Sequence, residues 1–176
     1  DCIDPENPVI RGKIGSAIGG NTNGYIHDCR VRNDTLWACN IYTGYVTIYD
    51  MRNVDSLKAI KSFKEYAPGG VSTHNCAFMP YNRNYFFSTD EYINPPAGKM
   101  NIWNISDLNN ITQVTTWHPT NIDSSDVHNV EIYGNYALVA NYTAGIRLIN
   151  ISNPAAPTEV AWYDTYPNNN KNQFTG

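Results

Sequence analysis

Three stretches of the sequence resemble one another, and this internal repeat restricts the possible folds more than any other feature. Each copy opens with a histidine followed by Asp or Asn, at His27, His74 and His128, and later contains an apolar run that ends in Asp or Asn. The copies recur about every 50 residues. A period of this length indicates a protein built from repeated structural units.

The third copy shows most clearly which elements form one unit. Its apolar and polar residues alternate, Gly134-Asn135 matches the two-residue turn of a tight hairpin, and helical periodicity is absent. Four short strands are expected in this copy, at residues 128–133, 136–141, 145–150 and 158–163. Four strands in a repeat of this length are typical of a propeller blade. The sequence therefore predicts an all-β protein, a β-propeller with four-stranded antiparallel blades.

The same frame, applied to the whole chain, predicts three complete blades, the outer strand of a preceding one and a linker toward a next one. Residues 1–14 are expected to end a preceding blade, with its outer strand over residues 9–14, and residues 167–176 form a linker toward a next one. The complete blades are expected at residues 15–66, 67–119 and 120–166, with a loop inserted at 91–99. Closed propellers contain about 4–8 blades. The chain is therefore expected to form an incomplete ring, as a fragment or as a piece that pairs with the rest of its own propeller.

Composition argues against two classes of partner. Charged residues make up 16% of the 176-residue chain and the net charge is −4, so the chain lacks the basic surface that binds nucleic acid. No apolar run approaches the roughly 20 residues of a transmembrane helix, so no membrane-spanning segment is expected in this chain.

The repeated histidines are the first candidate site. Counting from the hairpin turns places His27 and His128 opposite asparagines, and alignment of the copies gives His74 an aspartate, each on the same face and about 5 Å away. The expected pairs are His27–Asn40, His74–Asp90 and His128–Asn141.

Two interpretations of these pairs are open. Each histidine could lock its own blade by bonding to the facing residue, as the repeated histidine of WD-repeat propellers does. Alternatively, His27, His74 and His128 could gather with Asp90 at the mouth of the central channel and bind Zn²⁺ or a related ion. The first interpretation is favoured because a residue that recurs in every blade is expected to have the same structural role in each blade.

Tyrosines and an acidic pair complete the candidates. Tyr42, Tyr92 and Tyr142 stand near the start of the loops between second and third strands, where they could form platforms for a sugar or peptide, or pack between blades. The adjacent Asp90 and Glu91 could serve a cation or acid–base chemistry, but Glu91 is expected to be exposed. No nucleophile elbow, phosphate loop or zinc-binding helix motif occurs, and His118 is expected to be a solvated loop residue.

Several segments resemble the LVIVD-repeat family, which includes the choice-of-anchor B surface proteins of bacteria. The matching stretches are Tyr25–Asp28, Val127–Asn129, Ala140–Gly145 and Ile151–Pro154. The resemblance implies a propeller on the outside of a cell. It implies no particular chemistry, because fold alone does not establish function.

These observations predict a non-enzymatic recognition or scaffold module that is secreted or held at the cell surface. Its partner would be a protein, peptide or glycan bound at the channel mouth. No cofactor is expected, although a divalent metal is possible. The alternative is a metal-dependent enzyme with its site at the same channel mouth.

The four cysteines are predicted to be unpaired. Alternation places Cys29 and Cys39 on opposite faces of one hairpin, and Cys76 falls on the next blade, so their Cβ atoms are expected to lie beyond the roughly 3.5–4.5 Å of a disulfide. With Cys2 they are expected to act as small buried hydrophobic residues.

Overall fold

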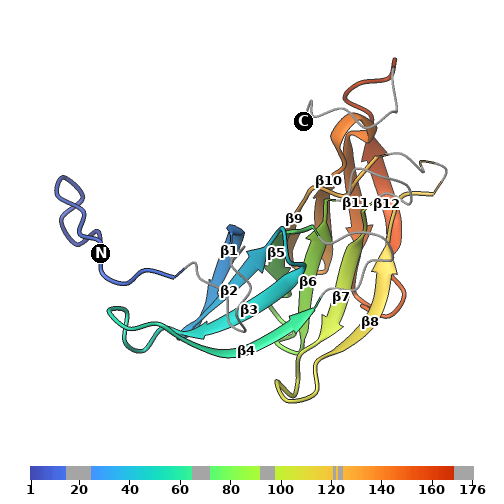
Figure 1. Ribbon diagram of the computed structural model, residues 1–176. Coiled ribbons are helices and arrows are strands. Elements are labelled where there is room, and N and C mark those ends of the chain that lie inside the picture. The colour runs from blue at the N-terminus through green and yellow to red at the C-terminus, as the bar shows by residue number, and fades with distance from the viewer. Residues whose placement is uncertain (15–24, 65–71, 92–97, 121, 123–124, 169–176) are drawn as a thin grey trace.

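The computed structural model describes residues 1–14, 25–64, 72–91, 98–120, 122 and 125–168. The strands among these residues form three four-stranded antiparallel sheets (Figure 1). The first sheet contains β1 (Ile26–Arg32), β2 (Thr35–Asn40), β3 (Tyr45–Asp50) and β4 (Lys58–Lys64). The second contains β5 (Thr73–Phe78), β6 (Tyr85–Asp90), β7 (Met100–Asn104) and β8 (Thr112–Trp117). The third contains β9 (Asn129–Tyr133), β10 (Tyr136–Ala140), β11 (Ile146–Asn150) and β12 (Thr158–Tyr163).

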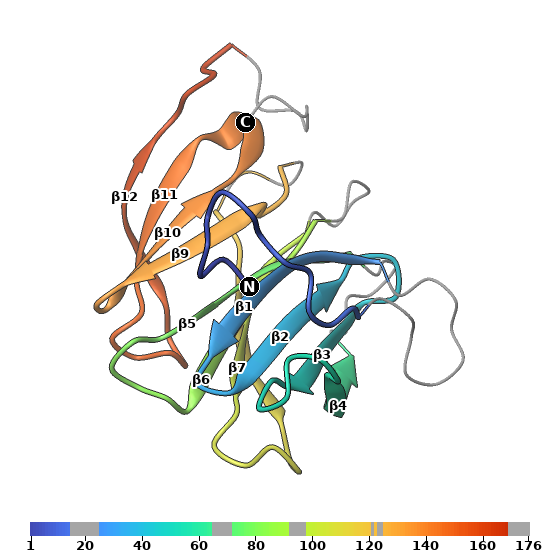
Figure 2. The same ribbon diagram turned by 90° about the vertical axis from the view of Figure 1, so that its left-hand side faces the viewer.

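The three sheets are arranged as consecutive propeller blades. Within each sheet the strands follow one another in sequence order, and the first strands of neighbouring sheets, β1 with β5 and β5 with β9, contact each other. These inner strands lie together, while β4, β8 and β12 lie at the periphery (Figures 1 and 2). The predicted all-β propeller with four-stranded blades is therefore confirmed. No helix among the described residues is long and apolar enough to cross a bilayer.

The apolar core lies between neighbouring blades, and the middle blade contributes to both halves of it. Successive residues of a strand point to opposite faces, so Phe86 packs with Trp37 of the first blade while Phe87 packs with Val130 and Ile149 of the third. The rings of Trp37 and Phe86 have centroids 4.8 Å apart. The middle blade is consequently buried on both faces.

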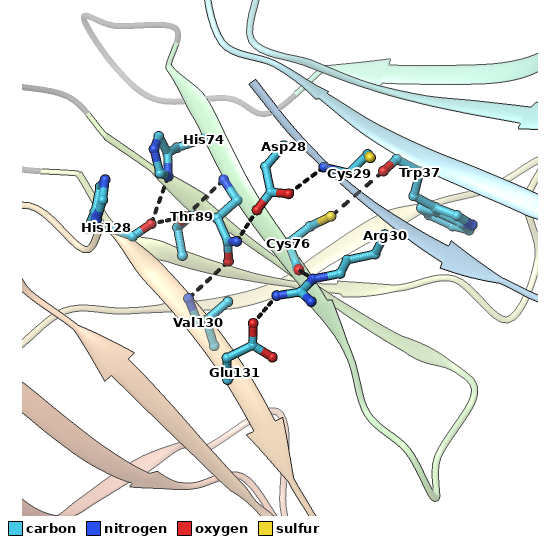
Figure 3. A network of polar contacts seen from close by, with 11 residues as sticks. Asp28, Cys29, Arg30, Trp37, His74, Cys76, Thr89, His128, Val130 and Glu131 are labelled. Carbon is cyan, nitrogen blue, oxygen red and sulfur yellow. Dashed lines mark hydrogen bonds and ion pairs between the residues drawn. The ribbon is translucent and has the colours of Figure 1, made fainter. Parts of the chain in front are cut away.

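A polar network ties the inner strands to each other (Figure 3). From β5, the Asn75 side chain donates to the Asp28 carboxylate on β1 and accepts the Val130 backbone N–H on β9 at 3.0 Å. Arg30 of β1 donates to the Cys76 carbonyl at 2.9 Å and forms an ion pair with Glu131 of β9 (Figure 3). These contacts connect all three inner strands to one another.

Two expectations need correction. Residues 9–14 form no strand, since no neighbouring strand pairs with them among the described residues; instead Arg11 bonds to the Asp55 carboxylate at 2.7 Å. None of the four cysteines forms a disulfide, as predicted, but only Cys39 and Cys76 are buried, whereas Cys2 and Cys29 are exposed.

Candidate functional site

Each repeated histidine stands at the beginning of an inner strand, and in the first two blades the strand pairing is irregular there. Ile26 pairs with Asn40 and Asp28 with Cys39, so the register shifts across His27, and the same shift occurs across His74 in the second blade. His128 directly precedes β9, and its backbone N–H donates to the Ala140 carbonyl at 2.9 Å. A bulge inserts one unpaired residue and redirects its side chain.

The predicted cross-strand pairs are therefore wrong in the first two blades, where Asn40 is opposite Ile26 and Asp90 is opposite Thr73. In the third blade the predicted register is kept as far as Asn129 and Ala140, and His128 and Asn141 lie just beyond the paired strands. The prediction counted residues outward from each turn and assumed unbroken alternation. One extra residue in the inner strand is enough to shift the register.

The three imidazoles instead meet one another and form a row across the blades, which we call the histidine row (His27, His74 and His128). The ring centroids are 4.0 Å apart for His27 and His74 and 4.2 Å apart for His74 and His128. The ring of Tyr142 extends the row, with its centroid 4.6 Å from that of His128. Equivalent positions on three blades thus converge on one place.

Glu91 lies beside the histidine row and was not predicted there. It follows β6 directly, and its side chain is only 12% exposed, contrary to the expectation of an exposed residue. Its Oε2 lies 3.4 Å from Nε2 of His74 and its Oε1 lies 3.8 Å from Nε2 of His128. The hydroxyl of Tyr142 donates a hydrogen bond to Oε1. A carboxyl group from the second blade therefore faces imidazoles from two blades.

The hydrogen bonding of His74 fixes which of its nitrogens carries the proton. Its Nδ1 lies 3.1 Å from the carbonyl oxygen of His128, which also accepts the Thr89 hydroxyl at 2.6 Å (Figure 3). Because a carbonyl oxygen only accepts, Nδ1 is the protonated nitrogen, and Nε2 turns its lone pair toward Glu91. Burial, followed by His128 and His27, lowers the pKa of His74 to about 4.

Burial also sets the charges of the neighbouring groups. It lowers the pKa of His128, with a further contribution from His27. Burial and the nearby Asp126 raise the pKa of Glu91 to about 7. At neutral pH the imidazoles of His74 and His128 are therefore uncharged, and their contacts with Glu91 are not ion pairs.

These side chains line a pocket of about 470 Å³, which we call the inner-strand pocket. Besides the histidine row, Glu91 and Tyr142, Asp28 and Asn129 line it. Ligand pockets commonly have volumes of about 300–1,000 Å³. The pocket can therefore accept a small group or the end of a larger partner.

The geometry that places Tyr142 in the pocket is unusual. Tyr142 begins η1 (Tyr142–Ala144), a single 3₁₀ turn that ends where the N–H of Gly145 donates to the Tyr142 carbonyl at 2.9 Å. The φ angle of Tyr142 is +41°, a left-handed conformation that bulky residues rarely adopt. Such strain is frequent at functional sites, where the surrounding structure maintains it.

Other predicted site residues lie elsewhere. The Asn40 amide bonds to the carbonyls of Ala38 and Tyr45 at 3.2 and 3.0 Å, and the Asn141 amide bonds to the carbonyl of Ser125 at 2.9 Å. Each of these asparagines supports its own blade.

The remaining candidates do not join the histidine row either. Asp90 is 2% exposed and does not line the inner-strand pocket. Tyr42 is 65% exposed with its ring 5.6 Å from that of Tyr25, and Tyr92 lies outside the described residues. His118 is half-buried rather than solvated, with its two ring nitrogens 3.0 Å from the carbonyls of Pro119 and Ser125.

Similarity to known proteins agrees with the architecture. A candidate 6-phosphogluconolactonase from Bacteroides fragilis NCTC 9343 superposes with a TM-score of 0.56 at 15% identity, over 74% of this chain and 36% of the other. The computationally designed Ika8 protein gives a TM-score of 0.54 at 10% identity, over 78% and 37%. The chain thus spans little more than a third of either protein, and similarity at such identities shows the fold alone.

The sequence comparisons identify one of the blades. No curated protein matches the sequence. Residues 124–165, which include all four strands of the third sheet, match the model of the LVIVD repeat. The resemblance seen in the sequence is confirmed over this segment, where the blade formed by β9 to β12 matches the LVIVD repeat.

Proposed function

We propose that this propeller is a recognition or scaffold module that acts outside the cell, without catalysing a reaction, and binds a protein, peptide or glycan at the inner-strand pocket. The proposal rests on one observation: side chains from all three blades converge there. Imidazole and tyrosine rings offer flat apolar faces, while Glu91, Asp28 and Asn129 offer hydrogen-bonding groups. This combination is typical of sites that orient a ligand.

A binding screen with matched variants tests the site. The intact protein is applied to glycan and peptide arrays, and each ligand found is measured again with His27→Ala, His128→Ala and Tyr81→Ala. Tyr81 is 85% exposed and lies between β5 and β6, at the end of the blade away from the pocket. We expect the two histidine variants to lose binding and Tyr81→Ala to retain it. Binding that survives both histidine variants would place the recognition site elsewhere.

The location outside the cell is supported by the LVIVD repeat at residues 124–165 and by the resemblance of the chain to surface proteins. Treatment of intact source cells with a protease tests it. We expect the protein to be degraded while a cytoplasmic marker survives, or to be recovered from the medium. Protection until the cells are lysed would contradict the proposal.

The alternative, a metal-dependent enzyme, is favoured by the grouping of His27, His74 and Glu91. The two candidates differ in whether a substrate is turned over. Ester, lactone and phosphoester substrates are incubated with the protein with and without EDTA. Turnover that EDTA abolishes would replace the recognition proposal with the enzymatic one.

A further inference from the structure

We propose that His27, His74 and Glu91 form a binding site for one divalent transition-metal ion of the zinc type. This inference rests on the proposed function, because it identifies the chemical means by which the inner-strand pocket would bind a partner. One ligand atom from each of the three residues lies within 4.8 Å of the other two. Two imidazoles and a carboxylate are a ligand set that suits Zn²⁺.

The distance between two of the ligand atoms already suits such an ion. Nε2 of His74 and Oε2 of Glu91 are 3.4 Å apart. In a tetrahedral zinc site with bonds of about 2.0–2.1 Å, neighbouring ligand atoms lie about 3.3 Å apart. His27 is the exposed second residue of β1, and one of its ring nitrogens lies within 4.8 Å of the ligand atoms of His74 and Glu91.

The surroundings prepare His74 and Glu91 as ligands. The Nδ1–H of His74 faces the His128 carbonyl at 3.1 Å, which leaves the Nε2 lone pair free, and metal-bound histidines are commonly held by such a bond. The Tyr142 hydroxyl bonds to Oε1 of Glu91 and leaves Oε2 directed at His74. Tyr142 makes this contact from a strained backbone conformation. These contacts orient both ligands before an ion binds.

When Glu91 is ionised, the arrangement without an ion places two acceptor atoms against each other, which also favours a cation. The Nε2 lone pair of His74 and the Oε2 of Glu91 face each other at 3.4 Å, and both atoms are acceptors when the carboxyl is ionised. A divalent ion between them would satisfy both groups and hold Glu91 in its ionised form. With three protein ligands, one coordination position would remain open toward the pocket, as in zinc sites that bind exogenous groups. A carboxylate or other basic group of the partner could occupy it.

Titration of the metal-free protein tests the site. The intact protein is stripped with EDTA, dialysed, and titrated with Zn²⁺ in a calorimeter, in parallel with Glu91→Gln, His74→Gln and Asp90→Asn. We expect one ion per chain and an affinity lowered by at least about 100-fold in the first two variants, beyond the loss typical of an outer-shell change. Asp90→Asn alters the adjacent carboxyl, which does not line the pocket, and we expect it to bind within about threefold of wild type, a minor change in free energy.

Cobalt provides a second measurement that does not depend on the folding of a variant. Co²⁺ added to the stripped wild-type protein should give the visible absorption of a low-symmetry four-coordinate site, and Zn²⁺ should displace it. An octahedral spectrum, an absence of stoichiometric binding, or equal affinity of wild type and Glu91→Gln would overturn the inference. Partner binding measured in EDTA separates the two proposals. A partner that still binds there while Zn²⁺ does not would refute only the metal site, whereas a protein that binds Zn²⁺ but no partner would refute only the recognition role.

Discussion

Asp90→Asn is expected to stabilise the protein at neutral pH. Asp90 is 2% exposed, and its Oδ1 has no hydrogen-bond partner among the described residues. Burial, followed by the nearby Asp126, raises the pKa of Asp90 from 3.8 to about 6, although a hydrogen bond from Ser72 opposes the shift. A group whose pKa is raised on folding binds more protons in the folded state. Between about pH 4 and pH 6, stability therefore falls as pH rises, and above pH 6 the whole penalty is present.

The size of the effect follows from the shift. About two pKa units at about 1.4 kcal/mol each give a penalty of about 3 kcal/mol at neutral pH. Asparagine has nearly the shape of the protonated acid and does not ionise, so Asp90→Asn removes this penalty. We expect the variant to be more stable than wild type by up to about 3 kcal/mol at pH 7.5, and by close to zero below pH 4.

Urea denaturation in EDTA measures this difference at pH 3.5, 5 and 7.5, with Glu6→Gln as the control. Glu6 is an exposed carboxyl residue near the N-terminus, and its substitution should change stability by less than about 0.5 kcal/mol at each pH. The reasoning would be refuted if Asp90→Asn were destabilising at pH 7.5. A stability difference that stayed constant with pH would refute it equally.

Three further predictions concern the blades. Asn75→Ala leaves polar groups on both neighbouring inner strands without their partner, so urea denaturation should show a loss of about 2 kcal/mol. Phe86→Ala opens a cavity between the first two blades and should cost about 3–5 kcal/mol by the same measurement, whereas Tyr81→Ala should cost less than about 0.5 kcal/mol. Hydrogen bonds from Arg52 lower the pKa of Asp50 to about 2, so NMR titration of Arg52→Ala should show that pKa moving back toward 3.8.

The blades could be predicted from the sequence because their signals are local. Alternating residues and tight turns such as Gly134-Asn135 define each hairpin without reference to the rest of the chain. The convergence of the histidines was also within reach, since equivalent positions of a repeat occupy equivalent places around the propeller. His27, His74 and His128 were considered together for that reason, and the structure brings their rings together.

The composition of the site could not be predicted in full, because it depends on irregularities. A count based on strict alternation cannot predict the shifts of register at His27 and His74. Because of these shifts, Asn40 and Asp90 lie opposite Ile26 and Thr73 instead of the histidines. Glu91 enters the pocket because β6 ends at Asp90, one residue before it. The only signal in the sequence was an acidic residue at the start of the inserted loop.

Two roles were considered for the repeated histidines, connecting the blade structure and gathering at a common site. In the structure these roles are divided between each histidine and the residue that follows it. The residue after the histidine connects the inner strands: Asp28 accepts a hydrogen bond from Asn75, and Asn75 accepts the backbone N–H of Val130. Because this connection is made by the neighbouring side chain, the bulged histidine need not complete the strand pairing and can point into the pocket. The backbone of the histidine row also connects two blades, because the carbonyl of His128 accepts a hydrogen bond from the His74 ring. The repeat thus connects the blades and also places one imidazole per blade in the inner-strand pocket, where Glu91, a residue outside the repeat pattern, adds a carboxyl group.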